Sequence, residues 1–79
     1  MITTRQIKAA RSLLAWSQED LASRSAVPYP TIARIEALDG RIRGRASTAA
    51  KIVTALESAG VIFIEENGEG PGVRLRKAK

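Results

Sequence analysis

The chain has 79 residues and a net charge of +5 at neutral pH, and it contains no cysteine and no histidine. This length predicts one domain, residues 1–79, and the missing residue types exclude disulfides, zinc fingers and thiol chemistry. The net positive charge favours an anionic partner. Nucleic acid is favoured over a membrane surface, because the basic residues lie mainly in a loop and a tail and not on one face of an amphipathic helix.

The first predicted element is a helix over about residues 4–14. Thr3 and Gln6 fit a capping box, in which each side chain binds the backbone N–H of the other residue at a helix start. Apolar residues then recur at helical spacing, which predicts the face that packs in the core. That face carries Ile7, Ala10 and Leu14.

Two short helices, over about residues 17–25 and 29–37, come next and are joined by a tight turn. Ser17 and Asp20 fit a second capping box at the start of the first of them. The second begins near Tyr29, between two prolines, because proline can start a helix but cannot lie inside one.

The second helix of this pair presents different residues to the core and to solvent. Ile32 and Ile35 share its predicted buried face. This spacing turns Arg34 and Tyr29 outward, where they are free to contact a partner.

The spacing of residues in this pair of helices resembles the Xre/Cro family, the lambda-repressor-like DNA-binding domains, over about residues 4–58. The matching positions are Ser17-Gln18, Glu19-Asp20, Leu21-Ala22, Val27, Thr31-Ile32 and Ile35-Glu36. Two positions depart from the pattern: Ala26 stands where the family usually has glycine, and Pro28 stands where Ser or Thr usually caps the second helix. The resemblance implies a mainly α fold, a four-helix lambda-repressor-like helix-turn-helix domain whose second helix of the pair reads DNA.

The resemblance also implies roles for particular residues. An arginine in the first helix of that family pairs with the glutamate that ends the recognition helix, which here implies an ion pair between Arg11 and Glu36. Such a pair is physically reasonable, because a carboxylate at the C-terminal end of a helix is disfavoured by the macrodipole and gains from a cation. The expected contacts to DNA bases are Tyr29, Pro30 and Arg34, and the expected contacts to the DNA backbone include Gln18 and Thr31.

The next segment, about residues 37–46, is predicted to be a loop because it contains Asp-Gly and a second glycine. Arg41, Arg43 and Arg45 occur at every second residue, so an extended backbone would place their guanidiniums on one side. Guanidinium binds phosphate through paired N–H donors. We therefore expect these arginines to contact the DNA backbone; the alternative is an ordinary solvated run of charges.

A fourth helix is predicted over about residues 48–58, capped by Ser47 or Thr48 and followed by Gly60. A β-hairpin with a long loop is predicted beyond it, over about residues 61–76, from an apolar run, a cluster of turn residues and an alternating segment.

This hairpin either simply covers the core or also contacts a second copy of the chain. Its first strand is apolar on both faces, and only one face can pack on the helices. The expected dimer interface is Val61, Ile62, Phe63 and Ile64.

We expect a binding protein and not an enzyme, with no cofactor and no metal. Catalysis needs a general base, a nucleophile or a metal in a pocket. The paired carboxylates, Glu19-Asp20 and Glu65-Glu66, have ordinary explanations at a helix N-terminus and in a solvated turn.

The leading function is sequence-specific binding of double-stranded DNA by a small transcriptional regulator, a repressor that acts as a homodimer on a two-fold symmetric operator. One alternative is a DNA-binding antitoxin, which would contact a second protein, its toxin; a co-regulator is a further possible partner. Another alternative is a protein-interaction module without DNA binding. Neither a signal peptide nor a membrane span is visible, so we expect a cytoplasmic protein, associated with the nucleoid when bound to DNA.

Overall fold

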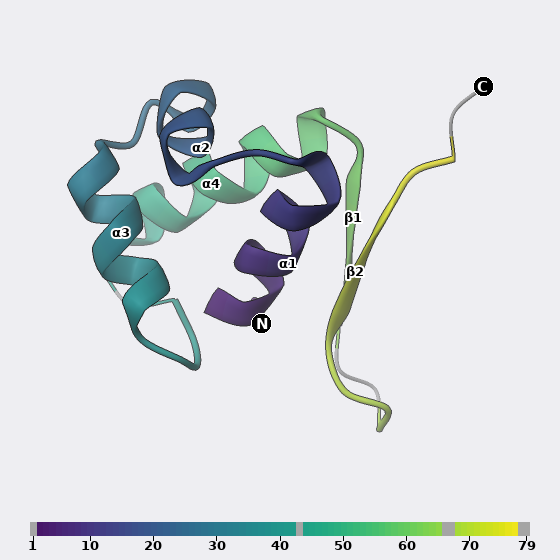
Figure 1. Ribbon diagram of the computed structural model, residues 1–79. Coiled ribbons are helices and arrows are strands. Elements are labelled where there is room, and N and C mark those ends of the chain that lie inside the picture. The colour runs from purple at the N-terminus through teal and green to yellow at the C-terminus, as the bar shows by residue number, and fades with distance from the viewer. Residues whose placement is uncertain (1, 43, 66–67, 78–79) are drawn as a thin grey trace.

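The computed structural model describes residues 2–42, 44–65 and 68–77. Within these residues the chain forms four helices and then a two-stranded antiparallel hairpin. The elements are α1 (Thr4–Leu14), α2 (Gln18–Ser25), α3 (Tyr29–Ala37), α4 (Ala46–Ser58), β1 (Val61–Ile64) and β2 (Gly72–Leu75). Figure 1 shows the hairpin beside α1, on the opposite side of the molecule from α3. The mainly helical class and the C-terminal hairpin expected from the sequence are confirmed.

Both predicted capping boxes form. Thr3 Oγ1 accepts from the Gln6 backbone N–H at 3.2 Å, and Gln6 Oε1 accepts from the Thr3 backbone N–H at 2.8 Å. Ser17 and Asp20 exchange the equivalent bonds at 3.0 and 2.9 Å. These bonds satisfy N–H groups that have no partner inside a helix, so α1 and α2 begin where the sequence predicted.

The first two helices both end at an alanine in the left-handed backbone region. Ala15 has φ 58° and Ala26 has φ 61°. This conformation costs an ordinary residue roughly 1–2 kcal/mol, because its Cβ crowds the following carbonyl oxygen. The chain therefore adopts at Ala26 the backbone that glycine favours, and turns directly from α2 toward α3.

The start of α4 differs from the prediction. The helix begins at Ala46, and its N-cap is Arg45, with no side-chain cap, so Ser47 and Thr48 lie inside the first turn rather than capping it. The Arg45 carbonyl oxygen accepts from the backbone N–H of Thr48 at 3.1 Å. The prediction was wrong because alanine is a strong helix former and extends the helix toward its N-terminus.

One apolar core lies where the four helices meet the start of the hairpin. Its buried members are Ile7, Ala10, Leu21, Val27, Ile32, Ile35, Ile52, Leu56 and Val61. Each helix contributes at least one of these residues, and Val27 comes from the turn between α2 and α3. The predicted buried face of α3, Ile32 and Ile35, is confirmed.

The hairpin has an inner and an outer face. Val61 pairs with Leu75 and Ile62 pairs with Arg74, and directly opposite residues share a face. Val61 is buried in the core, so alternation along β1 places Ile62 and Ile64 on the outer face.

Gln6 fixes the hairpin to α1. Its Nε2 donates to the backbone carbonyl oxygens of Ile64 at 3.2 Å and Gly72 at 3.0 Å, which belong to opposite strands. One buried side chain therefore holds both strands of a two-stranded sheet that would be only marginally stable alone.

Among the described residues, no helix is long and apolar enough to cross a membrane.

Candidate nucleic-acid interface

The outward face of α3 carries a positive charge and no negative one. Tyr29, Pro30 and Arg34 are all exposed, as expected, and Thr31 is half-buried beside them. Glu36 is the one acidic residue of α3, and it is turned into the protein, with its side chain 3% exposed. An anionic surface can therefore approach Arg34 without meeting a carboxylate from the same helix.

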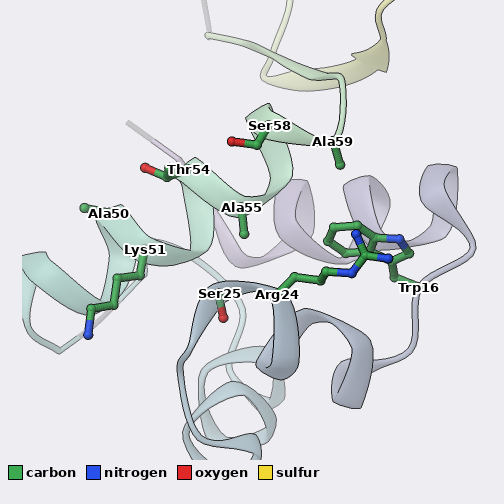
Figure 2. Close-up of a pocket in the computed structure, with 9 residues that line it drawn as sticks. All are labelled: Trp16, Arg24, Ser25, Ala50, Lys51, Thr54, Ala55, Ser58 and Ala59. Carbon is green, nitrogen blue, oxygen red and sulfur yellow. The ribbon is translucent and has the colours of Figure 1, made fainter.

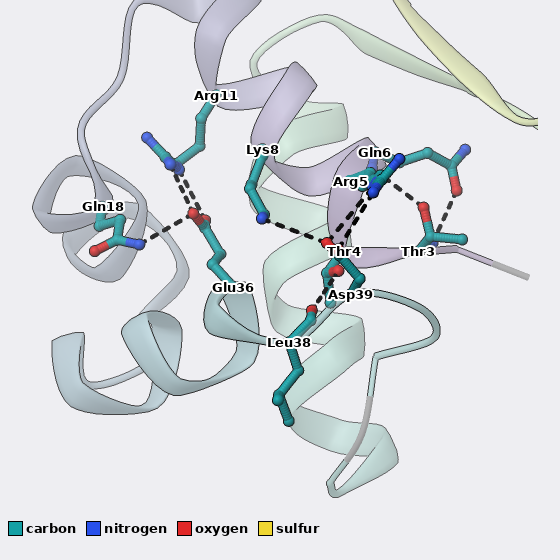
Figure 3. A network of polar contacts seen from close by, with 10 residues as sticks. All are labelled: Thr3, Thr4, Arg5, Gln6, Lys8, Arg11, Gln18, Glu36, Leu38 and Asp39. Carbon is teal, nitrogen blue, oxygen red and sulfur yellow. Dashed lines mark hydrogen bonds and ion pairs between the residues drawn. The ribbon is translucent and has the colours of Figure 1, made fainter.

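Glu36 is held in this buried position by Arg11 of α1. Arg11 donates from Nε to Glu36 Oε2 at 2.8 Å and from Nη2 to Glu36 Oε1 at 2.6 Å, a paired geometry that Figure 3 shows. The hydrogen bond to Glu36 raises the pKa of the Arg11 guanidinium above its ordinary value. The ion pair that the resemblance implied is therefore present, mostly buried and with both oxygens of the carboxylate bonded.

The same pair also joins α2 to α1 and α3. Arg11 Nη1 donates to the backbone carbonyl oxygen of Trp16 at 2.9 Å, in the linker that leads into α2. Gln18, the first residue of α2, donates from Nε2 to Glu36 Oε1 at 3.1 Å. These bonds fix the N-terminus of α2 against the C-terminal half of α3.

The side chain of Gln18 has a structural role that the sequence did not indicate. A carboxylate only accepts hydrogen bonds, so the amide must turn its NH₂ group toward Glu36. One N–H of that group is used inside the protein. Contact with a phosphate would come from the second N–H and from the backbone N–H groups of the first turn of α2, which have no partner inside the helix.

Arg34 and Arg41 lie at one small hollow. Both line a depression of about 150 Å³ together with Ile35, Leu38 and Gly44. The hollow lies between the last turn of α3 and the loop that follows it. The structure thus brings together one residue expected to read bases and one expected to contact the backbone.

The loop between α3 and α4 carries the three arginines that the sequence spaces two residues apart. Arg41 forms an isolated antiparallel bridge with Thr3, and Gly44 has φ 109°. Arg43 lies outside the described residues. Arg41 and Arg45 are both exposed, and Arg45 is the N-cap of α4. The expectation that the three guanidiniums share one side therefore stays a prediction.

Two other cations of α1 are already paired. Asp39 accepts from Arg5 Nη2 at 3.2 Å and lies 3.7 Å from Lys8 Nζ. The hydrogen bond from Arg5 holds the pKa of the Asp39 carboxyl below its ordinary value. The sequence did not show this cluster, because 34 residues separate Arg5 from Asp39.

The residues expected at a dimer interface lie apart from this surface. Val61 is buried in the core, whereas Ile62, Phe63 and Ile64 are half-buried on the hairpin. Figure 1 places the hairpin on the other side of α1 from α3. A partner bound to the hairpin would therefore leave the outward face of α3 open.

Comparisons with known proteins assign no family to this arrangement. No family model matches the chain, and no curated protein matches it. What the surface can do follows from its own chemistry. It offers an exposed guanidinium on a short helix, a second one at the adjacent loop, and the N-terminus of α2 fixed against α3.

Proposed function

We propose that this protein binds double-stranded DNA in a sequence-specific manner, as a small transcriptional regulator of the Xre/Cro type. In this proposal α2 and α3 form a lambda-repressor-like helix-turn-helix, and α3 is the recognition helix. The observation that carries the proposal is the outward face of α3, where Arg34 is exposed and Glu36 is withdrawn into an ion pair with Arg11. The major groove of B-form DNA is wide enough to admit such a helix.

Each residue of the surface has a distinct task in this proposal. Arg34 donates a pair of hydrogen bonds to guanine O6 and N7, while Tyr29 and Pro30 contact neighbouring base edges. Thr31, Arg41, Arg45 and the first turn of α2 contact phosphates and so position the helix. Ala33 and Ala37, on the same helix, are small enough to let it approach the bases closely.

The regulator would act as a homodimer, because one helix of this length reads only a few base pairs. Two copies related by two-fold symmetry bind two half-sites about 10–10.5 base pairs apart. Occupancy of such an operator would exclude RNA polymerase, which makes repression the proposed outcome.

Selection of bound duplexes from a random pool tests this function directly. We expect enrichment of a two-fold symmetric motif with half-sites about one helical turn apart. Recovery of unrelated sequences, with equal affinity for the starting pool, would reject sequence-specific binding.

Arg34→Ala is expected to weaken binding to the selected operator by about 1–3 kcal/mol per half-site and to relax specificity at one base pair. The physical reason is the loss of a paired contact to one base. Fluorescence anisotropy on the operator, and on a set of single-base variants, measures both effects. Lys77→Ala is the matched control, since it removes an exposed cation that follows β2 and does not belong to α3. An equal loss on cognate and scrambled duplexes would assign Arg34 to the backbone.

Arg41→Ala and Arg45→Ala are expected to weaken all duplexes alike. Each lost phosphate contact reduces the dependence of log affinity on log salt by about 0.9 per protomer. The measurement is the affinity for one duplex across a salt series, with Arg5→Ala as the control, because Asp39 already neutralises that cation. A salt dependence that stays the same in the Arg41/Arg45 double variant would remove both residues from the interface.

A further inference from the structure

A groove of about 440 Å³ lies between the last turn of α2 and the flank of α4, as Figure 2 shows. Small side chains of α4 and of its C-cap, among them Ala55 and Ala59, form one wall and leave the space open. Trp16 closes one end, and Ser25 lies beneath. This volume falls within the range of about 300–1,000 Å³ that is usual for sites of small molecules.

The charged residues that line this groove are both cations. Arg24 lies at the Trp16 end and Lys51 lies toward the other end. Neither forms an ion pair with a carboxylate in the part of the chain that the structure describes. Asp20, one turn before Arg24 on α2, instead accepts from the backbone N–H of Ser17.

Arg24 is held in a position that suits an anion. Its guanidinium carbon lies 5.0 Å from the centroid of the Trp16 ring, in a cation–π contact. Stacking uses the face of the guanidinium and leaves its N–H edge available, and that edge matches the two oxygens of a carboxylate. The stacked side chain also loses less conformational freedom on binding than a free arginine would.

We propose that this groove binds a small organic anion, a carboxylate attached to an apolar body. The carboxylate contacts Arg24, with Lys51 as the second cation, and the apolar body lies against Ala55 and Ala59. An apolar wall favours such a molecule over inorganic phosphate, which would gain nothing from it. The site shares no residue with the proposed DNA interface, so its ligand can be measured without DNA.

The test is a titration of the isotope-labelled full chain, followed by two-dimensional NMR, with 4-phenylbutyrate and with its neutral amide as probes. We expect 4-phenylbutyrate to shift the amide resonances of Ser25, Ala55 and Ala59 and the indole N–H resonance of Trp16, the one tryptophan, to saturation. The neutral amide should bind at least about fivefold more weakly, because it lacks the charge-assisted hydrogen bonds. Inorganic phosphate at the same ionic strength should not displace the carboxylate.

Two variants and one control test which cations of the groove bind the carboxylate. Arg24→Gln and Lys51→Gln should each weaken the binding of 4-phenylbutyrate by about threefold or more, whereas Lys77→Gln should leave it unchanged. Lys51→Gln is independent of the Trp16 contact, so it still tests the site if Arg24→Gln disturbs the tryptophan. Equal affinity for the acid and the amide, shifts outside the groove, displacement by phosphate, or variants that bind like Lys77→Gln would each overturn the proposal.

Discussion

Arg11→Met is expected to lower the free energy of unfolding by about 3 kcal/mol. The change would leave the Glu36 carboxylate, 3% exposed, without the two hydrogen bonds at 2.8 and 2.6 Å that now satisfy it. Only the bond from Gln18 at 3.1 Å would remain inside the protein. The expected loss lies at the lower end for buried pairs because Arg11 itself is 19% exposed and water can reach the site.

Urea unfolding followed by circular dichroism measures this loss, and the exposed pair of the same helix supplies the control. Arg5→Met breaks the ion pair with Asp39, in which the Arg5 side chain is 77% exposed and the Asp39 side chain is 62% exposed. This change should therefore alter the free energy of unfolding little. The double variant Arg11→Met/Glu36→Met completes a thermodynamic cycle. It should be more stable than the sum of the single losses predicts, because neither residue then leaves a buried charge unpaired. Simple additivity would show that the two side chains do not interact energetically.

Local signals in the sequence were sufficient for most of the fold. The capping boxes and the apolar spacing depend only on residues three or four apart, and they placed α1, α2 and α3 correctly. The predicted hairpin was also confirmed. It was predictable because a run of strand residues, a cluster of turn residues and a second strand segment follow one another after Gly60. The predicted start of α4 was wrong because the N-cap residue, Arg45, makes no side-chain capping bond and so leaves no recognisable signal in the sequence.

Two polar contacts that join distant segments could not be predicted from local patterns in the sequence. Asp39 looked like part of a turn, yet in the folded chain it neutralises Arg5 and Lys8. Gln18 looked like a free phosphate ligand, yet Glu36 holds its amide. Both outcomes depend on how α1, α2 and α3 pack, which no local pattern specifies. The bond from Gln18 also makes the proposed backbone contact depend on the integrity of the ion pair.

Ile62→Glu or Ile64→Glu is expected to convert a two-fold dimer into a monomer that binds its operator at least about 100-fold more weakly, because a linked second half-site adds avidity of that order. The inner face of the hairpin is already occupied, since Val61 is 1% exposed in the core. Alternation and the pairing register put both isoleucines on the outer face. A partner strand there would cover apolar surface that otherwise invites aggregation.

The distribution of charge along the hairpin fits a second copy in the antiparallel direction. Glu69 lies in the loop between the strands, and Arg74 and Lys77 lie toward the base. Two hairpins related by a two-fold axis perpendicular to their strands would run antiparallel. The acidic loop of each would then lie beside the basic, open end of the other, in a closed isologous contact. The same mutual arrangement would leave the outward face of α3 free on both copies.

Sedimentation equilibrium of the wild-type protein and of the Ile62→Glu variant decides this prediction, with circular dichroism to verify that the variant is folded. Thr54→Glu is the matched control, because it adds the same charge at an exposed position of α4 and not on the hairpin. The wild type and Thr54→Glu should sediment as dimers, and Ile62→Glu as a folded monomer. A wild-type protein that stays monomeric at concentrations well above its operator affinity, or an Ile62→Glu variant that stays dimeric, would place the two-fold contact elsewhere or remove it.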